Sequence, residues 1–174
     1  MSNTNEWLEK GDDAFDNNDF QTAIDCYTKV IESDIEYAAA YEGRGLSYYS
    51  ISEADKAIAD LTLAIQYDKN NHNVLFNRGL IWQEKEQLDK AAADYDAALE
   101  LFDNSVLYLT EAAQVNLMMT NYEKTVEYSK RILAVEPNDL YGLVYLGQAQ
   151  LGLKNYEEAL KVYQLLLRRN PKDG

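Results

Sequence analysis

Residues 38–71 read AAAYEGRGLSYYSISEADKAIADLTLAIQYDKNN, and blocks of the same 34-residue length follow this pattern along nearly the whole chain. In this register the five predicted repeats span 4–37, 38–71, 72–105, 106–139 and 140–173. A fixed period of this length is typical of stacked supersecondary units, each of which packs only on its neighbours. The sequence therefore predicts a repeat architecture, organised as a single domain over residues 1–174, rather than one central core.

Small residues recur at two positions of every block and define its register. The eighth position holds Gly11, Gly45, Gly79, Ala113 and Gly147. The twentieth position holds Ala23, Ala57, Ala91, Thr125 and Ala159. Bulky apolar residues alternate with them, as two closely crossing helices require, because missing side chains let the backbones approach while larger ones fill the gaps.

This pattern resembles the tetratricopeptide repeat, whose Trp, Leu-Gly, Tyr, Ala, Phe and Pro signature is met most fully by residues 38–71 and 140–173. Apolar spacing of three and four residues predicts one helix over Ala38 to about Ser50 and another over Glu53 to about Tyr67. The resemblance implies an all-α, right-handed superhelical solenoid of five helix-turn-helix repeats. It also implies a concave face lined by the first helix of each pair.

The repeats can be compared with one another, and the comparison links two positions. The two blocks with Arg at the seventh position, Arg44 and Arg78, are those with Asp at the twenty-third, Asp60 and Asp94. We therefore predict two salt bridges that join the paired helices, Arg44 with Asp60 and Arg78 with Asp94. Loss of one partner would strand a partly buried charge, at a cost of about 3 kcal/mol or more.

Charge is distributed unevenly along the chain. Thirty acidic residues against sixteen basic ones give a formal charge of −14, which argues against nucleic acid or an anionic membrane as a partner. The first repeat holds ten Asp or Glu and two Lys, whereas the last holds five Lys or Arg and three Asp or Glu. This asymmetry favours either a solvated acidic surface or attraction of a basic partner segment to the first repeat.

Members of the family often hold a peptide in the concave groove, so the inward positions of the first helices are the expected binding residues. A basic or apolar segment is expected there. The predicted groove residues are Leu8, Asp12, Glu42, Leu46, Tyr49, Asn73, Phe76, Leu80, Gln83, Thr110, Gln114, Leu117, Tyr141, Val144 and Gln148.

The groove lacks the cations that co-chaperone members of the family use to grip an acidic C-terminus. Those proteins place Lys, Asn and Arg at fixed groove positions. The corresponding positions here are Leu8, Asp12, Gly43, Asn73 and Asn77. An acidic C-terminal tail is therefore not the expected ligand.

An enzymatic function finds little support in the sequence. His72 is the chain's only histidine, so neither a His-based metal site nor a His-containing catalytic pair can be built. The run Asp68 to Asn73 resembles the start of a calcium loop, but Asn73 stands where Gly is needed. We expect no catalysis, cofactor or metal.

The last predicted helix, about Tyr156 to Arg169, raises the main alternative. Its apolar residues Leu160, Tyr163, Leu166 and Leu167 would be covered by a further repeat, because solenoids need a polar cap at each end. Either the chain is a fragment of a longer protein, or these residues support self-association as a dimer or head-to-tail assembly. A small acidic secretion chaperone is a third, weaker possibility.

Two further features bear on location. The sequence has no run of 18 apolar residues and no signal-peptide pattern at its start. Its single cysteine, Cys26, cannot form an internal disulfide and is expected to be a buried packing thiol. A cytoplasmic protein is the expectation.

Overall fold

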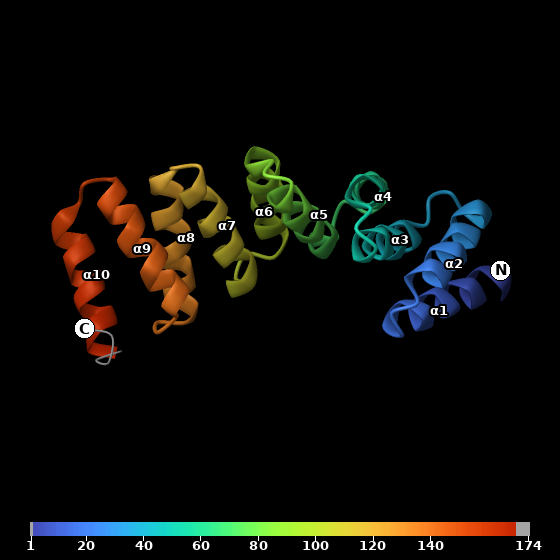
Figure 1. The fold of residues 1–174 in the computed structure, drawn as a ribbon, viewed down its shortest axis with the longest axis horizontal. Helices are drawn as coiled ribbons and strands as arrows, with labels where there is room; N and C mark the ends of the chain where they lie inside the picture. Colours follow the sequence, from blue (N-terminus) through green and yellow to red (C-terminus); the bar gives the residue numbers. More distant parts are fainter. Residues whose placement is uncertain (1, 170–174) are drawn as a thin grey trace. The chain divides into compact units, whose positions relative to one another are not determined.

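A computed structural model describes residues 2–169, and over that range all regular structure is α-helical. The sequence prediction of ten helices in five antiparallel pairs is confirmed, and the last four residues of the fifth predicted repeat lie outside the described range. The helices, coloured in order in Figure 1, are α1 (Ser2–Asp16), α2 (Phe20–Ser33), α3 (Ala38–Ser50), α4 (Ala54–Tyr67), α5 (His72–Glu84), α6 (Leu88–Leu101), α7 (Val106–Met118), α8 (Tyr122–Val135), α9 (Leu140–Gly152) and α10 (Tyr156–Arg169).

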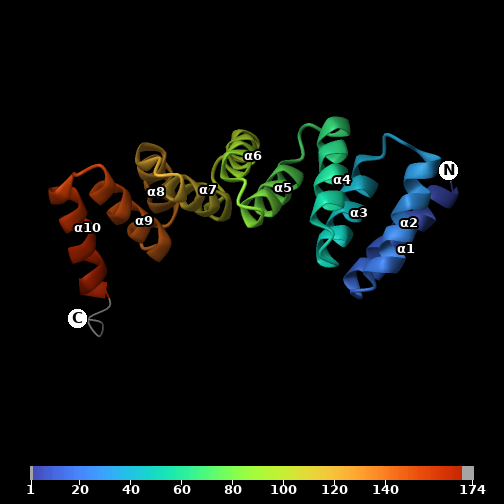
Figure 2. The ribbon, with the colours of Figure 1, turned by 45° about the horizontal axis from the view of Figure 1, so that its top comes forward.

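The helices belong to two compact units, Met1–Glu84 with α1–α5 and Lys85–Gly174 with α6–α10. In each unit every helix packs against the next one along the chain, α1 to α5 in the first unit and α6 to α10 in the second (Figures 1 and 2). First helices of neighbouring repeats also touch, α1 with α3 in one unit and α7 with α9 in the other. That the five repeats form one domain stays a prediction.

The small residues that set the register lie where helices come closest. The twentieth-position residues Ala23, Ala57, Ala91, Thr125 and Ala159 are all at most 1% exposed. At the eighth position, a Cβ on Gly11 would lie 2.8 Å from the ring of Tyr27, and one on Gly147 would lie 3.0 Å from the ring of Tyr163. Each glycine thus makes room for the twenty-fourth residue of its own repeat, on the partner helix.

The turn within each repeat has one recurring conformation. Asn18, Ser52, Glu86, Thr120 and Lys154 follow one another at 34-residue intervals and all have φ between 57° and 64°. In four of the turns, the amide of the next residue also donates to the carbonyl five residues back, as from Asp19 to Ala14 and from Asn155 to Gln150, both at 2.8 Å. These bonds form the Schellman motif, which satisfies the carbonyls at a helix end and reverses the chain.

Candidate functional site

The first helices of the first unit enclose an open cavity on the face that the sequence predicted to bind a peptide. Its volume is about 260 Å³. Three predicted groove residues, Asp12, Glu42 and Leu46, contribute to its lining. The full lining is Asp12, Phe15, Tyr27, Ala39, Glu42, Gly43 and Leu46, so that only Tyr27 comes from a second helix.

Tyr27 is the floor of this cavity. It lies on α2, is 3% exposed, and packs against two glycines, Gly11 on α1 and Gly43 on α3. A Cβ on Gly43 would overlap the Tyr27 ring, so only glycine leaves this ring its place. The Tyr27 hydroxyl donates to Oδ1 of Asp12 at 2.8 Å. Burial, and then this bond to Asp12, raise the pKa of Tyr27, which therefore stays protonated and fixes the carboxylate of Asp12.

Glu42 supplies the second carboxylate, from the α3 side of the cavity. Its Oε2 accepts a hydrogen bond from Nδ2 of Asn71 at 2.9 Å, which links α3 to the turn before α5. Burial raises the pKa of Glu42, and the charge of Asp68 raises it further, although the hydrogen bond from Asn71 acts in the opposite direction. A partly buried carboxylate with a raised pKa gains more from a neighbouring cation than an exposed one does.

The other predicted groove residues of this unit differ in how much they expose. Tyr49 donates to Oε1 of Glu84, and burial, followed by that bond, raises the pKa of Tyr49 to about 12. Phe76 is only 7% exposed and offers little surface to a ligand. Leu8, Leu80 and Gln83 are half-buried, and Asn73 is exposed.

In the second unit none of the predicted groove residues is itself a carboxylate. Tyr141 is 59% exposed, and its ring centroid lies 6.2 Å from that of Tyr145. The Tyr145 hydroxyl donates to Oε1 of Gln114 across α9 and α7 at 3.4 Å. Thr110, Leu117 and Val144 are half-buried, whereas Gln148 is exposed.

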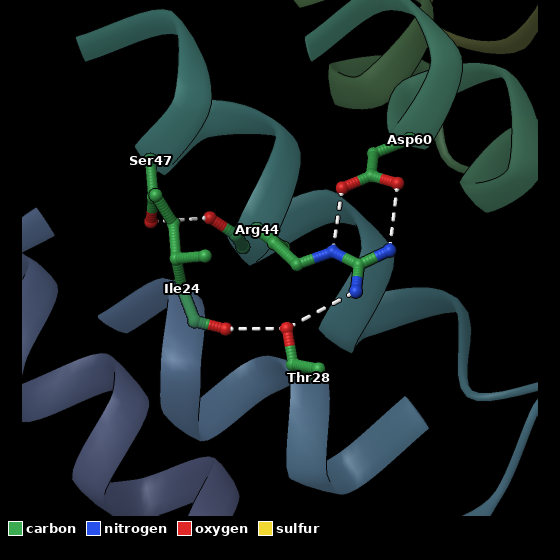
Figure 3. Close-up of polar contacts among 6 residues, drawn as sticks. Ile24, Thr28, Arg44, Ser47 and Asp60 are labelled. Carbon is green, nitrogen blue, oxygen red and sulfur yellow. Dashed lines mark hydrogen bonds and ion pairs between the residues drawn. The ribbon is translucent and has the colours of Figure 1, made fainter. Parts of the chain in front are cut away.

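Arg44 joins three helices of the first unit (Figure 3). Its Nε and Nη2 donate to the two carboxylate oxygens of Asp60 at 2.7 and 2.9 Å, and its Nη1 donates to Oγ1 of Thr28 at 3.1 Å. The side chains of Arg44 and Asp60 are 17% and 8% exposed, so this is a nearly buried bidentate pair. Arg78 makes the matching bond to Thr62 at 3.0 Å. Because Asp94 belongs to the other unit, its pairing with Arg78 stays a prediction.

The apolar residues predicted for self-association lie on α10. Leu160 and Leu167 are 58% and 56% exposed. Tyr163 and Leu166 are half-buried, and the Tyr163 ring packs against Gly147 of α9. Two of the four residues are therefore available to a partner surface.

Sequence reasoning missed Tyr27 and Gly43 as cavity residues, because the groove was predicted only from positions facing inward on first helices. A signal was present: an aromatic residue at the twenty-fourth position of one repeat is followed by glycine at the sixth position of the next. The absence of a side chain at that point is what admits the ring.

Within residues 2–169, His, Cys, Asp and Glu side chains do not gather in any group of three or more that could hold a metal ion. In the same span, no helix combines the length and apolar character needed to cross a membrane. Cys26 is buried, and burial raises the pKa of its thiol, which makes the thiolate less available.

Comparison with known families and proteins gives consistent matches. Two family models, both described as tetratricopeptide repeat, match residues 8–71 and residues 72–105 and 141–173. The Probable inactive receptor-like kinase BSK12 of Arabidopsis thaliana is 43% identical over 66 residues, which is 32% of this chain and 14% of that protein. The Probable serine/threonine-protein kinase BSK3 of Oryza sativa subsp. japonica is 38% identical over 66 residues, 37% of this chain and 13% of that protein.

Solved structures share the fold. MamA is 21% identical with a TM-score of 0.86, and the match covers 99% of this chain and 94% of that one. YrrB, described as a TPR protein with an unusual peptide-binding site, is 18% identical with a TM-score of 0.85, covering 96% and 86%. The first TPR of Spaghetti (RPAP3), bound to the HSP90 peptide SRMEEVD, is 24% identical with a TM-score of 0.65, covering 68% and 94%.

Proposed function

This chain belongs to the tetratricopeptide repeat family, and from that premise we propose that it is a non-catalytic scaffold that binds a peptide or protein segment on the inner face of its first helices. The observation that carries this proposal is the open cavity between α1 and α3, lined by Asp12, Glu42 and Leu46. Structural neighbours with bound or recognised peptides, YrrB and Spaghetti, support the same use of the fold.

The bound segment is proposed to be basic or apolar. The Spaghetti domain is bound to a peptide that ends in two glutamates, valine and aspartate. In this chain the inner face of the first unit presents Asp12 and Glu42, which would repel such a sequence. Half-buried apolar groups such as Leu46 and Phe15 offer a surface whose burial is worth about 25 cal/mol per Å² before ordering costs are subtracted.

A matched pair of alanines tests the inner face. Ala39 lies at the cavity on α3, whereas Ala59 lies on α4, and both are exposed, so arginine at either site is compatible with the helix. Random 12-residue peptides displayed on phage would be selected on the full chain, and the selected peptides measured by fluorescence anisotropy. We expect Ala39→Arg to weaken binding at least tenfold and Ala59→Arg to leave it unchanged. Equal affinities for both variants would contradict the proposal.

Self-association is a second candidate, favoured by the exposure of Leu160 and Leu167 on α10. Light scattering at several protein and salt concentrations tests it. A concentration-dependent mass that Leu160→Glu together with Leu167→Glu abolishes would support this function. A monomer at every concentration would exclude it.

A further inference from the structure

We propose that the cavity between α1 and α3 binds the side chain of a lysine or arginine carried by the partner segment. The inference rests on the proposed function, because it assumes that a segment lies on this face, and it adds the chemistry that the segment must carry. Its basis is the lining of the cavity, which combines two carboxylates from different helices, apolar walls and no basic residue.

The two carboxylates have acceptor capacity that the fold does not use. Oδ1 of Asp12 is taken by the hydroxyl of Tyr27 and Oε2 of Glu42 by the amide of Asn71. Neither Oδ2 of Asp12 nor Oε1 of Glu42 accepts a bond from any of the residues 4–168 whose side chains are described. Bonds from a cation to carboxylates are about twice as strong as those between neutral groups, so a Lys or Arg head placed between the two acids would be held firmly.

The remaining walls suit the aliphatic stem of such a side chain. Phe15, Ala39 and Leu46 contribute apolar surface to the same lining as the two acids. Lysine and arginine characteristically bury their methylene stems on apolar surface while the charged head stays near polar groups. The volume of about 260 Å³ is slightly smaller than the range of about 300 to 1,000 Å³ for small-molecule sites, which favours one side chain as the occupant.

The chain contains an internal contrast to this cavity, three repeats further on. There Gln114 replaces Asp12, Val144 replaces Glu42, and Tyr145 replaces Gly43. Both acids are absent there, and the ring of Tyr145 stands at the position where Gly43 leaves room for Tyr27 in the first unit. Selectivity for a cation is therefore assigned to the first unit alone, which is also the part of the sequence richest in acidic residues.

Simple side-chain analogues test the inference without a known partner. The full chain, labelled with ¹⁵N, would be titrated with n-butylammonium and n-butylguanidinium, and separately with butyrate and n-butanol. We expect saturable shifts of the backbone amides of Gly43 and Leu46 with both cations, and none of comparable size with butyrate or n-butanol. The apparent affinity should fall as salt is added, because the pair is partly exposed.

Isosteric variants provide the control. Asp12→Asn with Glu42→Gln removes both charges but leaves carbonyl oxygens that Tyr27 and Asn71 can still donate to, so the fold is retained. This variant should bind the cations at least tenfold more weakly, whereas Glu9→Gln with Asp13→Asn, an equal loss of two charges at exposed residues outside the cavity lining, should not. Unchanged binding by the double variant, or equal shifts with n-butanol, would overturn the inference.

The outcome can be separated from that of the proposed function. Peptides selected on the chain that depend on Ala39 but not on Asp12 or Glu42 would refute the cation pocket and leave the binding face intact. Cation binding in the cavity without any selected peptide would support the cation pocket and contradict the proposed peptide-binding function.

Discussion

In both units a tyrosine hydroxyl donates to the ninth-position residue of a first helix, but the tyrosine comes from a second helix in the first unit and from a first helix in the second. In the first unit, Tyr27 comes from a second helix, lies against Gly43 and donates its hydroxyl to Asp12. In the second unit the equivalent positions are Ser129, Tyr145 and Gln114, and the phenol that donates to the ninth-position residue comes from the first helix. The large residue Tyr27 and the small residue Gly43 correspond to the small Ser129 and the large Tyr145, and in both cases the tyrosine hydroxyl donates a hydrogen bond to the ninth-position residue. The charge of the inner face can therefore change without changing how the helices pair.

The polar contacts made by the second helices also differ between the two units. Arg44 on α3 bridges Asp60 on α4 and Thr28 on α2. In the fourth repeat Ala112 stands in place of arginine and Tyr128 in place of aspartate. Tyr128 and Lys124 on α8 both reach Asp96 on α6, with distances of 2.5 Å. The first unit thus depends on a nearly buried ion pair, whereas the second uses a phenol and a partly exposed lysine.

The largest expected effect is the loss of Arg44. Arg44→Met leaves the carboxylate of Asp60, 8% exposed, without its bidentate partner. Breaking a buried pair in this way costs about 3 kcal/mol or more of unfolding free energy. Urea unfolding followed by circular dichroism measures the loss.

The double variant Arg44→Met with Asp60→Leu is its control, and it should be close to the parent because both charges are gone. Additive costs for the two substitutions would show that the pair is not coupled. The same cycle on Arg78 and Asp94 tests the pairing that remains a prediction.

The next effect concerns Gly43, which lines the cavity and packs against Tyr27. Alanine is normally the better residue inside a helix, but a Cβ on Gly43 would overlap the ring of Tyr27. Overpacking of this kind costs about 2 kcal/mol, so Gly43→Ala should lower the urea midpoint. In a Tyr27→Leu background the same substitution should cost nothing or stabilise. A cost that persists in that background would show that contact with the Tyr27 ring is not what requires glycine at position 43.

The sequence predicted most of the fold because its main signals are periodic. Ala23 and Ala57, at the same position of successive repeats, are both fully buried where helices pack closely. The observed α3 and α4 begin and end within one residue of the predicted bounds. Tyr27 was missed because its role depends on Gly43 in the following repeat, which is a contact between repeats. The turn residues Ser52 and Glu86 carry no residue-type signal for their positive φ, which is imposed by the reversal of the chain.

A smaller effect is expected at Tyr128. Tyr128→Phe removes one hydrogen bond to Asp96, whose side chain is 30% exposed and keeps its ion pair with Lys124. A hydrogen bond to a charged group contributes about 1.5 to 3 kcal/mol, and the partial exposure of Asp96 places this one near the lower end, below the value for Arg44. Urea unfolding of this variant beside Arg44→Met measures the difference. A loss at Tyr128 as large as that at Arg44 would mean that exposure does not distinguish the two clusters.

The smallest effect should appear in the pH dependence of the first unit. Burial raises the pKa of Glu42 in the folded chain above its unfolded value of 4.5, so the folded state binds more protons between those two values. Stability from this group therefore rises as pH falls through the raised pKa and stops changing below the unfolded pKa. The unfolding free energies of the parent and of Glu42→Gln are measured at pH 7 and pH 5. The difference between the two proteins isolates the contribution of Glu42, because the other carboxylates are common to both. The unfolding free energy of the parent should rise relative to that of Glu42→Gln as the pH is lowered. A difference that does not change with pH would show that Glu42 is as hydrated as a carboxylate on an open surface. The second unit has Val144 at the equivalent position and therefore has no counterpart of this contribution.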